Sequence, residues 1–100
     1  MTKLVIESDE LQHTSLLVKT AIADELKTIS WVIEMTIRRL TEFEQEYKKT
    51  SAEFYQQFQK GVTGDSEEVM EWAGEYETLL RLQQNFSRLK EMEIADRRLF

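Results

Sequence analysis

The stretch from Ile22 to Tyr47, IADELKTISWVIEMTIRRLTEFEQEY, decides the fold of this chain. It contains neither proline nor glycine, and its apolar residues recur every three or four positions: Ile22, Leu26, Ile29, Ile33, Ile37, Leu40, Phe43 and Tyr47. This spacing places apolar side chains along one stripe of an α-helix. Proline and glycine are absent from Glu10 to Lys49, so we expect one long helix over residues 10–49, about 60 Å in length.

A second long helix is expected after the clearest break in the chain. Residues 61–66, GVTGDS, hold two of the three glycines and predict a chain reversal. The following segment is acidic at its start and basic at its end, which suits the helix dipole, so a helix is expected over residues 66–96. Its apolar residues again follow three-four spacing, with Gln83 expected to interrupt the stripe as a buried polar position that sets register.

Two shorter elements complete the predicted order. Thr50 and Ser51 followed by Glu53 are typical of a helix start, so a short helix is expected over residues 51–60. Residues 1–8 are expected to form an arm with a strand at Lys3–Glu7, where Val5 and Ile6 are β-branched. Because a lone strand needs another edge, Leu4, Val5 and Ile6 are expected to bind a partner.

We therefore expect a single, mainly α domain over residues 1–100, in which the two long helices form an antiparallel hairpin. The expected seam includes Ile22, Ile29, Ile33 and Ile37, with Trp31 beside it. The apolar surface of the first helix looks wider than one hairpin neighbour can cover. This excess predicts a homodimer that completes a helical bundle.

The composition narrows the class of protein. The chain has no cysteine, which excludes a disulfide-stapled domain and fits a reducing compartment. Charged residues interrupt every apolar run, so no membrane segment is expected, and the first residues do not resemble a signal peptide. A cytoplasmic location follows as the expectation. The net charge of −6 opposes direct binding of nucleic acid and favours a basic protein partner.

The residue inventory argues against an enzyme and against a cofactor or metal. His13 is the single histidine, with no second histidine and no cysteine to share a transition metal. The many carboxylates lack the Glu-x-x-His motif of di-metal helical bundles. A solvated acidic surface explains them more simply.

One acidic segment is a candidate partner-binding surface. Residues 65–77 contain six acidic residues and no basic one. The residues expected to contact a basic partner are Asp65, Glu68, Glu71, Trp72, Glu75 and Tyr76. The alternative is that these carboxylates only favour the helix dipole and solvation.

Several motifs together resemble a known group of proteins. They are Ser51-Ala-Glu-Phe54-Tyr-Gln-Gln-Phe58-Gln-Lys-Gly61, Gly64-Asp65, Glu71-Trp-Ala-Gly-Glu-Tyr-Glu77 and Leu4-Val-Ile-Glu-Ser8. In these the chain resembles small prokaryotic antitoxin-like helical proteins. The resemblance implies an inhibitor that binds a small toxin, such as a ribonuclease, encoded alongside it. A structural coiled coil or assembly adaptor without a toxin is the alternative that the same helices would serve.

Overall fold

The computed structural model describes the backbone of residues 2–99 and the side chains of residues 10–95. It contains α1 (Thr2–Tyr47), α2 (Ser51–Gln59) and α3 (Glu67–Leu99), and no strand lies within residues 2–99. The prediction of a mainly helical chain is confirmed. The molecule is a rod with extents of 69 × 22 × 22 Å.

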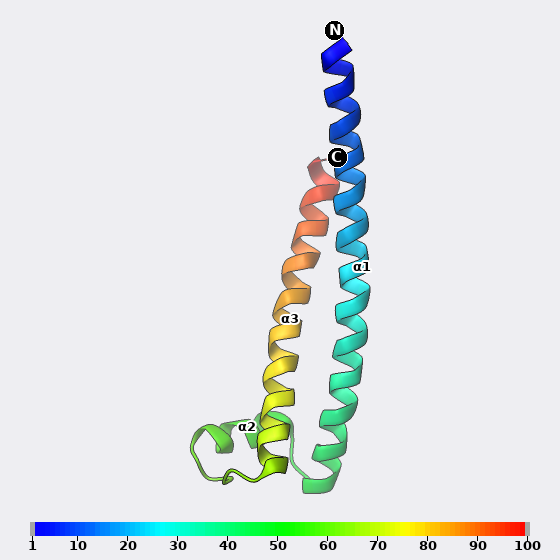
Figure 1. Cartoon of the computed structure of the whole chain (residues 1–100). Coiled ribbons are helices and arrows are strands. Elements are labelled where there is room, and N and C mark those ends of the chain that lie inside the picture. Colours follow the sequence, from blue (N-terminus) through cyan, green and yellow to red (C-terminus); the bar gives the residue numbers. More distant parts are fainter. Residues whose placement is uncertain (1, 100) are drawn as a thin grey trace.

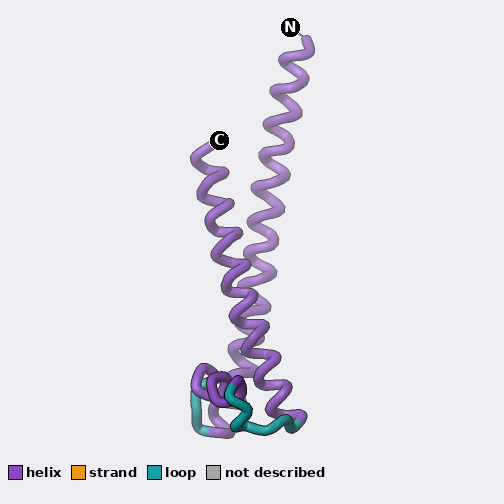
Figure 2. The backbone as a smooth tube through the Cα atoms, turned by 90° about the vertical axis from the view of Figure 1, so that its left-hand side faces the viewer, coloured by secondary structure: helices purple, strands orange, loops and turns teal. Residues whose placement is uncertain are grey.

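The two long helices lie side by side and run in opposite directions, with α2 packed at the bend between them (Figure 1). Because α1 has 46 residues and α3 has 33, the first turns of α1 reach beyond the end of α3. The view turned by 90° shows the same pairing and the loops gathered at the bend (Figure 2). Only the bend therefore brings three helices together.

The predicted strand at Lys3–Glu7 is wrong, because α1 begins at Thr2. A helix satisfies its backbone hydrogen bonds within one segment, whereas a strand here would need an edge that residues 2–99 do not supply. The β-branched pair of Val5 and Ile6 expresses only a weak local preference, which helix propagation from the following residues overrides. The side chains of Leu4, Val5 and Ile6 lie outside the described residues.

The seam of α1 follows a strict alternation of four and three residues. Its buried positions are Ser15, Ile22, Leu26, Ile29, Thr36 and Leu40, with Lys19, Ile33 and Phe43 half-buried at the intervening steps. This is the 3.5-residue repeat that keeps one face of a helix against a long partner. Along this seam α1 packs against α3 in the hairpin.

Thr36 occupies the seam position that the apolar pattern assigned to Ile37. Thr36 is 2% exposed, whereas Ile37 is 44% exposed. One residue of offset turns a side chain by about 100° around the helix, so only one of the two can face α3. The Thr36 hydroxyl donates to the Val32 carbonyl at 2.8 Å, which satisfies the buried polar group within α1.

Gln83, expected in the stripe of α3, and Trp31, expected beside the seam of α1, both face solvent. Gln83 is exposed and does not provide a buried polar position in α3. Trp31 is 62% exposed. Since Trp31 follows Ile29 by two residues, it points about 200° around α1 from a seam side chain and lies on the opposite side of the helix.

The bend is held by caps and by backbone that favours glycine. α1 ends at Tyr47, the next residue, Lys48, adopts a positive φ of 54°, and the Thr50 side chain accepts from the Glu53 amide to cap α2. Gly61 and Gly64 have φ values of 75° and 79°, in the region that glycine enters at little cost. The Ser66 hydroxyl then accepts from the Val69 amide at 3.2 Å and caps α3.

The most buried cluster lies at the bend rather than along the rod. Leu40, Phe54, Trp72 and Ala73 form its centre. Around them pack the half-buried residues Phe43, Tyr55, Phe58, Val69, Tyr76 and Leu79. Three helices contribute to this cluster, so it can surround a side chain on all sides, which a two-helix seam cannot do.

Candidate functional site

Four aromatic rings stack on one another where the three helices meet at the bend. Trp72 is 2% exposed, and its ring lies 3.8 Å from that of Phe54 with an interplanar angle of 4°. Phe43 and Tyr47 stack on it from α1 at centroid distances of 5.5 and 5.4 Å. The indole N–H donates to the hydroxyl of buried Ser51 at 2.9 Å. The orientation of the indole is thus set by contacts with α1 and α2.

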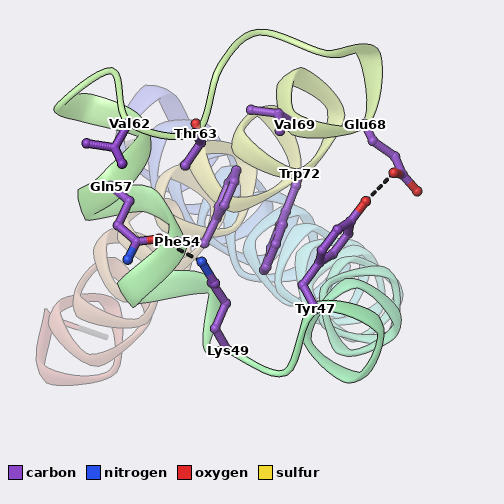
Figure 3. A pocket seen from close by; sticks show the side chains of 9 residues that line it. All are labelled: Tyr47, Lys49, Phe54, Gln57, Val62, Thr63, Glu68, Val69 and Trp72. Carbon is purple, nitrogen blue, oxygen red and sulfur yellow. Dashed lines mark hydrogen bonds between the residues drawn. The ribbon is translucent and has the colours of Figure 1, made fainter.

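A cleft of about 370 Å³ opens beside this stack (Figure 3). Its lining comes from the end of α1, from α2, from the glycine-containing loop and from the start of α3: Tyr47, Lys49, Phe54, Gln57, Val62, Thr63, Glu68, Val69 and Trp72. The volume is in the range of about 300–1,000 Å³ that small ligands or inserted side chains occupy. Aromatic rings and valines line much of it, with polar groups between them.

Hydrogen bonds order the polar groups of the cleft. The Tyr47 hydroxyl donates to a Glu68 carboxylate oxygen, and the Lys49 ammonium donates to Gln57 Oε1 at 2.7 Å (Figure 3). The hydrogen bond to Glu68 is the main cause that raises the pKa of Tyr47 to about 12, and desolvation and the negative charge of that carboxylate act in the same direction. Tyr47 therefore stays a neutral donor at physiological pH.

A second tyrosine makes a similar contact beside the core cluster. The Tyr55 hydroxyl donates to Glu77 Oε1 at 2.8 Å, and this hydrogen bond is the main cause of a raised pKa for Tyr55. Tyr76 packs against the Tyr55 ring at a centroid distance of 5.1 Å. The tyrosines thus join α2 and α1 to the acidic start of α3.

The structure divides the expected acidic surface into two groups. Glu68 and Glu75 have partners within the chain, the first in Tyr47 and the second in Arg39, whose Nη1 lies 3.2 Å from Glu75 Oε1. Asp65 precedes α3 and Glu71 lies near its start, and both are exposed. Part of the acidic run therefore contacts α1, and part has only solvent around it in the described chain.

The two aromatic residues expected on this surface are not both available to a partner. Trp72 is a core residue, because its ring, near the start of α3, packs against α2 and the end of α1. Tyr76 is half-buried. The six acidic residues in residues 65–77 show that this part of the chain is charged. They do not show which side of α3 packs against the other helices.

Residues of the cleft outside α3 were not identified from the sequence as site residues. Tyr47, Lys49 and Gln57 belong to the end of α1, the connection and α2, and they meet Glu68 only through the reversal at the glycines. The one available signal was the aromatic density of residues 54–58, which was interpreted as a cap on the bundle. Their convergence depends on tertiary contacts.

The described residues contain no arrangement suited to metal chemistry. Among residues 10–95, no group of three histidines, cysteines or carboxylates could hold a metal ion. His13 is exposed on α1. Within the described chain, no helix combines the length and the apolar character that crossing a membrane requires.

Comparison with known proteins found no counterpart. Neither a family model, nor a curated protein, nor a solved structure matches this chain. The function must therefore be inferred from the residues of the bend and from the surfaces of the two long helices.

Proposed function

We propose that this chain is a non-catalytic binding module that captures a basic segment of another protein at its bend. The observation that carries this proposal is the cleft of about 370 Å³, where Tyr47, which is 42% exposed, hydrogen-bonds the exposed Glu68 carboxylate, while Trp72 and Phe54 form a buried apolar lining. Aromatic faces and carboxylates both attract arginine and lysine side chains. Such a cleft suits an inserted cationic side chain better than an anionic group.

The surrounding charge supports the same class of partner. Asp65, Glu67 and Glu71 are exposed in the same run as Glu68, and the chain carries a net charge of −6. Complementary charge raises association rates and disfavours acidic partners. Among the described residues, Lys49 is the one cation that lines the cleft, and its ammonium donates a hydrogen bond to Gln57.

The biological form that we propose is antitoxin-like inhibition of a small basic toxin, with both proteins in the cytoplasm and without direct contact to nucleic acid or membrane. The support for this form is the resemblance carried by residues 51–61 and 71–77, together with the acidic run of residues 65–77 beside the cleft. Inhibition would follow from covering the basic surface with which a ribonuclease binds its substrate.

A titration with a defined probe tests the cleft. In a Trp31→Phe background, tryptophan emission reports Trp72 alone, and a short arginine-rich peptide is added at low ionic strength. We expect saturable binding that weakens with salt, and weakens by about threefold to tenfold on Glu68→Gln, which removes a charge but keeps an acceptor for Tyr47. Glu25→Gln, an exposed site on α1, is the matched control.

The outcomes of this titration are distinct. A glutamate-rich peptide of equal length should not bind. Equal losses for Glu68→Gln and Glu25→Gln, or no binding of the basic peptide, would contradict a role for the cleft. Growth rescue by co-expression with the product of a neighbouring toxin gene then tests the antitoxin-like form.

A second candidate function is a structural coiled coil or assembly adaptor without a toxin. The observation that favours it is the 69 Å rod, whose first helix exposes Leu16, Leu17 and Trp31 to solvent. Exposed apolar residues in one region mark surfaces that other chains cover. Both candidate functions include a homodimer, because a second copy of the chain could cover these exposed apolar residues of α1.

A further inference from the structure

A stripe of five exposed residues runs along α1 outside its seam with α3. Its members are Asp24, Lys27, Trp31, Glu34 and Arg38, and all five are exposed. They are spaced by three, four, three and four residues, so they fall within an arc of about 80° on the helix. A tryptophan that is 62% exposed lies at its centre. We call this set the α1 outer stripe.

The charges of the α1 outer stripe are antisymmetric about Trp31. Asp24 and Arg38 lie seven residues before and after Trp31 and have opposite charge. Lys27 and Glu34 lie four before and three after, and they also have opposite charge. An antiparallel copy of the stripe, centred on the same tryptophan, would therefore place every charge opposite one of the other sign.

We propose that a second copy of this chain docks antiparallel on the α1 outer stripe, with a twofold axis close to Trp31. Lys27 then faces the second copy's Glu34, and Asp24 faces its Arg38. The Lys27–Glu34 and Asp24–Arg38 pairs require registers of the two helices that differ by one residue, or about 1.5 Å along the helix axis. The long side chains can accommodate this difference. Twofold symmetry repeats each contact, so the interface contains four opposite-charge pairs around two indoles.

The surface beside Trp31 has room for an inserted ring. A groove of about 410 Å³ lies next to it between α1 and α3, lined by Leu26, Lys27, Ser30, Trp31, Glu34, Phe86 and Lys90. With the axis near Trp31, the second copy's indole falls opposite Ser30, at this groove. Buried aromatic anchors of this kind supply much of the affinity of protein interfaces.

The order of charges also selects the direction of docking. A parallel pair in register would place Asp24 against Asp24 and Lys27 against Lys27, and like charges at an interface are unfavourable. Docking of an unrelated protein would not require opposite charges at matched distances on the two sides of Trp31, whereas docking of a second copy does. The inference rests on the homodimer included in the proposed function, and it names the face, the direction and the central residue.

Charge reversal tests the interface by sedimentation velocity at micromolar concentration. Wild type is expected to be a dimer. Lys27→Glu sets like charges against Glu34 at both symmetric positions and should raise the dissociation constant by about 10- to 30-fold, as should Glu34→Lys. The double exchange Lys27→Glu with Glu34→Lys restores complementarity and should recover the dimer.

Mixing the two single charge-reversal variants tests the proposed pairing of Lys27 with Glu34 most directly. Lys27→Glu and Glu34→Lys chains, each monomeric alone, should form a heterodimer because all their charges then match. Circular dichroism confirms that each variant keeps its helices, and Glu25→Lys, at an exposed position of α1, serves as a charge control. A monomeric wild type would overturn the homodimer itself. A wild-type dimer with no response to the reversals, or no heterodimer on mixing, would overturn only this interface.

Discussion

Replacing Trp72 tests whether the aromatic stack at the bend stabilises the hairpin. Trp72→Ala removes a fully buried indole that touches Phe54, Phe43 and Tyr47. Truncating a buried tryptophan costs about 3–5 kcal/mol, and leaving the buried Ser51 hydroxyl without its donor adds about 1 kcal/mol. A loss of about 4–6 kcal/mol is a large share of the roughly 5–15 kcal/mol that stabilises a domain.

Urea unfolding followed by far-UV circular dichroism measures this loss. All variants carry Lys27→Glu, so that self-association does not contribute to the apparent stability. Trp31→Ala is the matched control, and because Trp31 is exposed we expect its effect to stay within about 0.5 kcal/mol.

Two smaller changes separate packing from hydrogen bonding. Trp72→Phe keeps a ring but loses the N–H, and Ser51→Ala leaves that N–H buried without an acceptor, so each should cost about 1–3 kcal/mol. If Trp72→Ala lowers the free energy of unfolding no more than Trp31→Ala does, the stack does not hold the bend together and the reasoning fails.

Three further predictions concern the seam, the bend and the pH response. Thr36→Asp should destabilise by about 3 kcal/mol or more, while Ile37→Asp stays within about 1 kcal/mol in the same urea assay; equal effects would contradict the seam position. Lys48→Gly should stabilise by about 0.5–1 kcal/mol because of its positive φ, and Gly61→Ala should destabilise by about 1 kcal/mol, as thermal melts can show. Because folding raises the pKa of Tyr47 from 10.0 to about 12, its contribution to stability is complete below pH 10.0 and is lost as pH rises to about 12. That alkaline loss should be smaller in Tyr47→Phe, and an unchanged profile would contradict the contact with Glu68.

Local sequence patterns predicted the two long helices, but they did not predict every residue that packs in the seam between them. The absence of proline and the three-four spacing predict both long helices, and Thr50 and Ser51 followed by Glu53 predict the start of the short helix from residue type alone. At the N-terminus, the local β preference of Val5 and Ile6 was overridden because α1 continues through them. A pattern of apolar residues also assigned Ile37 to the seam, since it cannot tell that a threonine satisfied by its own helix fits the position better.

The sequence by itself determined that this chain is acidic, mainly helical and reversed at its glycines, because periodicity, charge and backbone freedom are local properties. Only the tertiary structure decided that Trp72 is a core residue and Trp31 an exposed one, since two residues with the same chemistry differ here in which side of their helix meets a neighbour. It also brought Tyr47 and Lys49 to Glu68 across a gap of about twenty residues. Such a meeting depends on the angle at which α3 returns along α1, and that angle is set by packing at the bend.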